Sequence, residues 1–165
     1  PEFKNAELLF TAAQTGVRET RHIKGEHVLT GEEYLNAVHF EDAVSRGAHP
    51  IDIHTAGDTT QKCQFLKNAA YIPYRSLIVP GFDNLLVAGR CFSADQVASA
   101  SVRVQASVMG LGQAAGCAAA QCACAGTSRC AHAAGHVAQM GCADLKERQG
   151  FQKAKQANRL HGHRK

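Results

Sequence analysis

The chain has 165 residues, a formal net charge of +4, 45% hydrophobic residues and seven cysteines. This length allows one ordinary domain with its own core, or part of a larger domain. No run is long and apolar enough to span a bilayer, so we expect no membrane contact. The odd number of cysteines argues against a disulfide framework, which favours a reducing, cytoplasmic location.

The positive charge is concentrated at the carboxyl end. Residues 144–165 contain seven Lys or Arg and two acidic residues, whereas residues 1–143 contain eleven and twelve. Basic tails can bind nucleic acid or anionic surfaces. Here the aromatic residues do not alternate with the charges, as a platform for stacked bases requires. We therefore expect no nucleic-acid partner and a partly disordered tail over residues 127–165.

The first 40 residues predict two helices separated by a strand. Apolar residues recur at helical spacing over residues 2–14, and Gly16 stands where that helix would end. Residues 20–29 alternate weakly between apolar and polar side chains, which predicts a strand. Thr30 and Glu33 form a capping-box pattern ahead of further apolar spacing, which predicts a helix start.

The middle of the chain predicts irregular and extended structure before a small-residue helix. Residues 45–71 are rich in turn signals, with a weak strand at 51–54. Residues 72–79 are expected to be extended. The apolar run 85–88 follows a Pro-Gly turn and predicts a strand buried on both faces of a parallel sheet. Residues 98–125 are dominated by small side chains and predict a helix pressed against a sheet or a ligand.

Five short stretches keep a common order along the chain, and together they are more specific than any one of them. They are Thr15–Arg21, Ile51–His54, Ile72–Leu77, Asn84–Ser93 and Ser101–Gly116. In this order they resemble the carboxyl-terminal part of the FAD-dependent oxidoreductase family, which is related to the fumarate reductase and glutathione reductase type flavoproteins. The resemblance covers about residues 7–126.

The resemblance implies an α/β fold: a partial FAD/NAD(P)-binding, Rossmann-like domain plus part of a substrate domain. Residues 1–75 would belong to the substrate domain, and residues 76–126 would be the carboxyl-terminal return of the FAD-binding domain. The implied function is hydride transfer between a small organic substrate and FAD.

The chain has no Gly-x-Gly-x-x-Gly loop after a strand, the motif that holds the cofactor pyrophosphate. The implied partner is therefore the missing amino-terminal part of the FAD domain, and we expect the chain alone to bind FAD poorly. The alternative is a noncatalytic remnant or interaction module that lacks this loop.

The resemblance also implies cofactor contacts. Gly89 and Arg90 would lie at the ribityl and pyrophosphate side of the flavin. The family often has an acidic residue where Arg90 stands, so Arg90 could meet a phosphate or a substrate carboxylate instead. A helix start, with its partial positive charge, would face the flavin pyrimidine ring. The residues expected in that first helical turn are Ser101, Arg103, Val104 and Gln105.

Four residues of the implied substrate domain are candidates for catalysis: His54, Arg75, Tyr74 and Arg18. Such side chains can hold an anionic or hydroxylated substrate and move a proton, and His54 is the first candidate for acid–base work. Structural roles are open for each of them. Arg18 can pair with Glu19 on the surface, Tyr74 can be a packed aromatic, and His54 can be an ordinary loop histidine.

Neither a metal site nor a reactive cysteine is expected. Cys130, His132 and His136 lie close together in sequence but lack the paired cysteines of a zinc site. Cys91 would lie beside the flavin, yet no Cys-x-x-Cys accompanies it, which favours an inert thiol.

Overall fold

The computed structural model describes residues 4–53 and 62–126, which form a mixed α/β structure with small sheets. The fold class agrees with the predicted α/β class and is consistent with part of an FAD oxidoreductase domain. In chain order, the elements are α1 (Gly31–Leu35), β1 (Ala43–Gly47), β2 (Ile51–Ile53), β3 (Lys62–Gln64), β4 (Ala70–Pro73), the 3-10 helix η1 (Tyr74–Ser76), α2 (Gln96–Val102) and α3 (Gln105–Cys124).

The described strands form two antiparallel pairs. β1 pairs with β4, with Ala43 opposite Pro73 and an irregular register between Ala43 and Ser45. β2 pairs with β3, with Asp52 opposite Cys63. The weak strand expected at 51–54 is therefore confirmed as β2, whereas β1 falls partly in a stretch expected to be a loop.

The prediction that residues 85–88 form a buried strand of a parallel sheet is wrong for the described part of the chain. This run makes an isolated antiparallel bridge between Leu86 and Ile78, and the amide of Val87 donates to the carbonyl of Leu77. Leu85 is 40% exposed. The run is bonded along one edge and has no second strand beside it within residues 4–53 and 62–126, so it is only partly buried.

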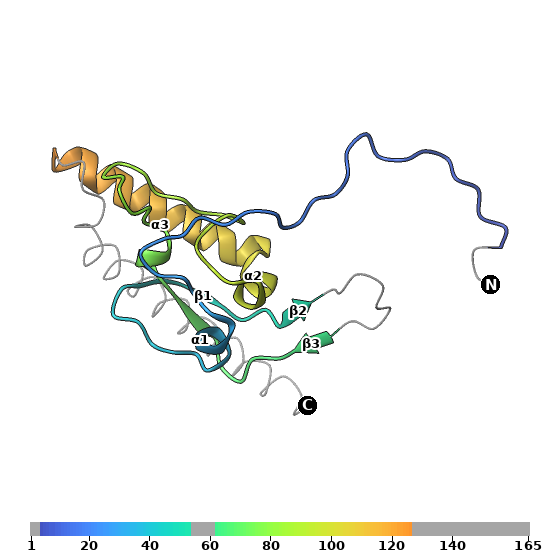
Figure 1. Cartoon of the computed structure of the whole chain (residues 1–165), viewed down its shortest axis with the longest axis horizontal. Coiled ribbons are helices and arrows are strands. Elements are labelled where there is room, and N and C mark those ends of the chain that lie inside the picture. The colour runs from blue at the N-terminus through green and yellow to red at the C-terminus, as the bar shows by residue number, and fades with distance from the viewer. Residues whose placement is uncertain (1–3, 54–61, 127–165) are drawn as a thin grey trace, which may run out of the picture.

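The predicted amino-terminal helix is also wrong for the residues that the structure describes. Residues 4–16 contain no helix and extend away from the rest of the molecule (Figure 1). Leu9 and Phe10 are each 84% exposed. Helical spacing stabilises a short helix mainly through tertiary packing of its apolar face. No described element covers the apolar face that this helix would have, so the helix would have no packing partner.

A single hydrophobic core joins the two sides of the predicted domain boundary at residue 75. Its largest fully buried side chains include Tyr34 and Tyr74 on one side and Phe92 and Leu111 on the other. α3 packs along β1, and α2 lies against α1 and β2 (Figure 1). The division into substrate and FAD-binding parts stays a prediction.

α1 begins with the expected capping box, although the helix is only five residues long. The amide of Glu33 donates to the Thr30 hydroxyl (3.2 Å), and the Glu33 carboxylate accepts from the Thr30 amide (2.9 Å). The same carboxylate lies 3.1 Å from Nε2 of His27. Burial raises the pKa of Glu33, but the hydrogen bonds from Thr30 and the bond and charge of His27 outweigh it and hold the pKa below its ordinary value.

This lowered pKa predicts an acid-sensitive contribution to stability. A carboxyl group whose pKa is lower in the folded state stabilises the fold above its ordinary value of 4.5, and the contribution is lost as the pH falls below that value. We expect the free energy of unfolding to fall less steeply between about pH 5 and about pH 3 in Glu33→Gln than in the parent. Urea unfolding at several pH values measures this. Glu32→Gln, on the exposed side of α1, is the control, and equal flattening in both variants would contradict the expectation.

Candidate active site

The stretch after Thr20 is held against the stretch that precedes α2. The amide of Ile23 donates to the carbonyl of Cys91 (2.9 Å), and the amide of Leu29 donates to the carbonyl of Ser93 (3.2 Å). The strand predicted over residues 20–29 is wrong, because this stretch forms no strand and its bridge joins only Leu29 and Ala94. The hydrogen bonds of Ile23 and Leu29 bring the extended segment 18–20 close to α2.

A polar hollow of about 430 Å³ opens where this segment meets β2 and α2. Its walls come from three parts of the chain: the extended segment, the end of β2, and the α2 helix with the residue that caps it. The lining residues are Arg18, Glu19, Thr20, Asp52, Ile53, Gln96, Ala100 and Arg103. The volume lies within the range of roughly 300–1,000 Å³ typical of small-molecule sites.

Arg103 is a largely buried charge in this hollow. Its guanidinium donates to the carbonyl of Asp52 (3.4 Å) and lies 3.8 Å from the carboxylate of Glu19. Its side chain is 15% exposed, so solvent screens these contacts only partly. The backbone of Arg103 caps α2, and both contacts direct its side chain toward the hollow.

Glu19 is held from the other side by His22. Nε2 of His22 lies 3.2 Å from the Glu19 carboxylate, and Nδ1 lies 3.1 Å from the carbonyl of Phe92. The ionised carboxylate of Glu19 and the carbonyl of Phe92 both accept hydrogen bonds. A neutral imidazole carries one N–H, so His22 in that form can donate to only one of them. His22 and Glu19 therefore form a hydrogen-bonded pair at the wall of the hollow.

The start of α3 carries no side-chain cap. Val104 is its N-cap residue in extended conformation, and no side-chain hydrogen bond satisfies the first amides. Gln105 and Ala106, at the first turn, are exposed. A helix start with free N–H groups carries partial positive charge and favours anionic or electron-rich partners.

The helix start predicted over residues 101–105 is only partly correct. Val104 and Gln105 do begin a helix, but Ser101 lies in the last turn of α2 and Arg103 caps that helix. The hydroxyl of Ser101 is buried, where it bonds to the carbonyl of His49 and lies 2.9 Å from the hydroxyl of Tyr34. The chain breaks between two helices where one continuous helix was expected.

Gly89, which is partly buried, and Arg90, which is exposed, lie on a turn beside the segment that contains Val17 and Arg18. Gly89 has a φ of +92°, and nothing lies within 4 Å of the position that a Cβ would occupy. A ligand could therefore approach this backbone closely. The guanidinium of Arg90 donates to the carbonyl of Val17 (2.8 Å), the residue that precedes Arg18 in the sequence.

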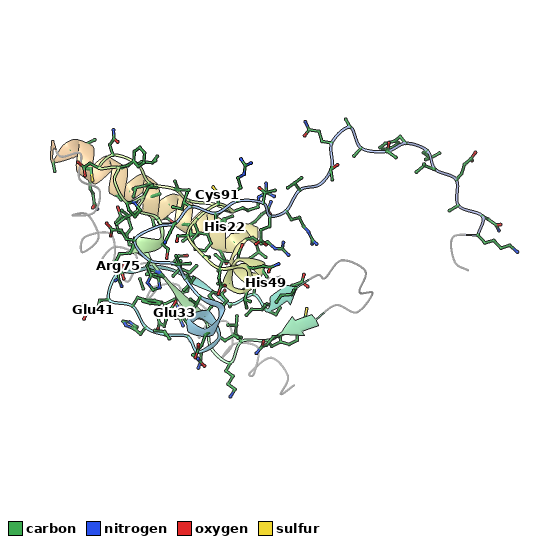
Figure 2. The ribbon with its side chains drawn as sticks, viewed as in Figure 1. His22, Glu33, Glu41, His49, Arg75 and Cys91 are labelled. Carbon is green, nitrogen blue, oxygen red and sulfur yellow. The ribbon has the colours of Figure 1, made fainter. Side chains whose placement is uncertain are left out.

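The candidate catalytic residues do not converge. Arg18 lines the hollow and is exposed, whereas Tyr74 is fully buried. Arg75 pairs with Asp42 through Nε (3.0 Å) and Nη2 (3.3 Å), and this partner raises the pKa of the Arg75 guanidinium. Figure 2 shows Arg75 apart from His22. The fourth candidate, His54, lies outside the described residues.

The described residues contain no group of three or more His, Cys, Asp or Glu side chains placed to hold a metal ion. The Cys130–His136 pattern lies outside the described residues. Within the described ranges, no helix is long and apolar enough to cross a membrane.

A family model described as FAD dependent oxidoreductase matches residues 1–140. The chain belongs to the FAD-dependent oxidoreductase family. No curated protein and no solved structure gives a significant match. Membership supports the oxidoreductase class and dependence on FAD, in agreement with the resemblance seen in the sequence.

The glycines of α3 do not supply the phosphate loop that the chain lacks. Gly110 and Gly112 are followed by Ala115, which gives Gly-x-Gly-x-x-Ala spacing. All three lie inside α3, and Gly110 faces the side chain of Ser45 in β1. Gly110 therefore allows α3 to pack closely on β1, whereas nothing lies within 4 Å of the position of a Cβ at Gly112.

Four polar residues that line the hollow were not predicted as site residues: Glu19, Thr20, Asp52 and Gln96. Two signals were available. Glu19 and Thr20 follow Arg18 directly, and Gln96 follows Asp95, a residue type that caps helices. Nothing local in the sequence indicates that the extended segment lies beside α2, because the bonds that hold it there join distant residues.

Proposed function

We propose that this chain is the carboxyl-terminal portion of a flavoenzyme that transfers a hydride between a small organic substrate and FAD. The observation that carries the proposal is the uncapped start of α3, which directly follows Arg103 at a polar hollow, in a chain of the FAD-dependent oxidoreductase family. When bound, FAD supplies the hydride acceptor.

The residues at the start of α3 fit the electron-rich edge of a flavin ring. The free amides of Gln105 and Ala106 and the guanidinium of Arg103 are all donors, and they lie at or next to the positive end of a 20-residue helix. The open backbone of Gly89 and the exposed Arg90 are the contacts that we assign to the ribityl and pyrophosphate side. These donor sets support binding of one part of the cofactor.

The hollow is the place that we assign to the substrate. Arg18 orients the substrate from the exposed rim, and Glu19, backed by His22, accepts or returns the substrate proton. We assign no substrate contact to Tyr74, which is buried, or to Arg75, which is engaged with Asp42. His54, which lies outside the described residues, keeps its predicted acid–base role.

Two surfaces favour a further polypeptide that carries the phosphate loop, the partner expected from the sequence. On the outer side of α3, Met109 is 73% exposed, and nothing lies within 4 Å of the Cβ positions of Gly112 and Gly116. The run 85–88 also has one edge without a described strand. A sheet with its own βαβ unit could cover both surfaces.

The test is the flavin content of two purified proteins. We expect the 165-residue chain to lack stoichiometric flavin absorbance, and a longer product that includes upstream coding sequence with a Gly-x-Gly-x-x-Gly loop to retain it. Stoichiometric flavin on the chain alone would contradict the half-site interpretation. A natural start of translation near Pro1, with no flavin on the product, would favour the noncatalytic module.

A variant pair tests whether the outer side of α3 meets that upstream part. Gly116→Leu should leave the stability of the 165-residue chain unchanged within about 1 kcal/mol, because the site is open. In the longer product it should reduce flavin retention at least about tenfold, because a side chain there would block close approach. Lys67→Leu, on an exposed loop, is the control. Equal retention in the two variants would contradict this interface.

A further inference from the structure

The charges that line the hollow balance one another. The lining residues include two arginines, Arg18 and Arg103, and two acidic residues, Glu19 and Asp52. The remaining polar groups are a hydroxyl and a side-chain amide, and two apolar residues complete the lining. The hollow therefore offers hydrogen-bond donors and acceptors in similar number, with no excess of either charge.

These charges also contact one another across the hollow. Arg103 is engaged by Glu19 and by the carbonyl of Asp52, and Glu19 is further engaged by His22. Arg18 makes no hydrogen bond or ion pair with any described residue. A bound carboxylate that reached Arg18 would lie close to the next residue, Glu19, and the repulsion would offset much of the attraction.

We propose that this hollow binds a neutral, polyhydroxylated substrate of the sugar class. Every hydroxyl group both donates and accepts a hydrogen bond, so a polyol can use guanidinium donors and carboxylate acceptors together. Arg18 donates, Glu19 accepts, and Thr20 and Gln96 can each do both. The proposal rests on the proposed function in one respect only, the assignment of the hollow to the substrate.

The ribityl chain of FAD also carries several hydroxyl groups. The test must therefore distinguish a hollow that binds a sugar substrate from one that binds the ribityl chain. The first arm titrates the isotope-labelled 165-residue chain with D-glucose, and in parallel with succinate at matched ionic strength, followed by NMR. We expect glucose to shift the Thr20 and Ala100 amide signals and the Arg18 and Arg103 side-chain signals in a saturable manner. Succinate should leave them in place. Saturable shifts with succinate, or none with glucose, would overturn the proposal.

Two variants test which side chains of the hollow determine the response in this titration. Thr20→Val removes one hydroxyl that lines the hollow and should weaken glucose binding by about threefold to tenfold. Glu19→Gln leaves the guanidinium groups in excess and should make succinate shift the same signals. Well-dispersed spectra establish that each variant is folded. Unchanged glucose binding in Thr20→Val together with no succinate response in Glu19→Gln would overturn the proposal.

The second arm repeats the glucose titration on the longer product with FAD bound. Glucose shifts that persist with FAD in place support a substrate site. Their disappearance would assign the hollow to the cofactor's own hydroxylated chain and overturn the proposal. Because the first arm contains no flavin, failure to retain FAD would count against the proposed function and leave the binding result intact.

Discussion

Tyr34→Ala is expected to lower the free energy of unfolding by about 3–5 kcal/mol, the range for removing a large buried aromatic side chain. Tyr34 is fully buried in α1, where its hydroxyl lies 2.9 Å from the Ser101 hydroxyl of α2. A methyl group at Gly47 of β1 would overlap the same hydroxyl. The ring therefore fills the space among three elements, and its loss would leave a cavity that they cannot close without moving.

Urea unfolding followed by circular dichroism measures this effect, since a stability change moves the midpoint. Tyr34→Phe is the matched control. It keeps the ring and removes one hydroxyl, and Ser101 retains the carbonyl of His49 as a partner, so we expect a loss of about 1 kcal/mol. A Tyr34→Ala midpoint close to that of Tyr34→Phe would show that the ring does not hold the three elements together.

Gly25→Ala should destabilise the chain by about 1–3 kcal/mol through overpacking. A Cβ at this position would lie 2.8 Å from the Cβ of Ser93 and 3.1 Å from the carbonyl oxygens of Arg75 and Ile78. Two of these three neighbours are backbone atoms, which cannot rotate away. The glycine also donates its amide to the hydroxyl of Ser93 (2.9 Å), so a shift of the backbone would weaken that bond.

Gly112→Ala is the control for this second prediction, and it should have the opposite sign. Gly112 lies inside α3, where nothing within 4 Å meets a Cβ. Alanine is favoured over glycine in a helix interior by about 0.5–1 kcal/mol. The urea midpoint of Gly25→Ala should therefore be lower than that of the parent, and the midpoint of Gly112→Ala should be higher. A loss of stability in both variants would refute the steric explanation for Gly25.

Features of the fold that depend on neighbours in sequence could be predicted. The Thr30 and Glu33 capping box is confirmed because its partners are three residues apart. The small-residue segment over 98–125 is confirmed as helical because its composition is helix-forming. The Asp95 cap of α2 carries the same kind of local signal, since its carboxylate accepts from the amide of Ala98 three residues later.

Features that depend on distant partners could not be predicted. No glycine or proline marks the break between α2 and α3, where Arg103 is drawn toward Glu19 and Asp52, far away in sequence. For the same reason, only part of the site could be predicted from the sequence. Arg18 and Arg103 were assigned to different roles and line the same hollow, whereas Arg75 is engaged by Asp42, a carboxylate 33 residues earlier.

The bonds that join residues 25–31 to the stretch before α2 also determine when the hollow can form during synthesis. The amide of Gly25 and the hydroxyl of Ser93 are separated by 68 residues, and the amide of Gly31 and its carboxylate partner Asp95 by 64. Closure of such long loops makes folding slow. On the ribosome, residues 18–31 must wait until Asp95 has emerged, so the nascent chain leaves Leu29 without its native cover and is open to chaperones and aggregation in that interval.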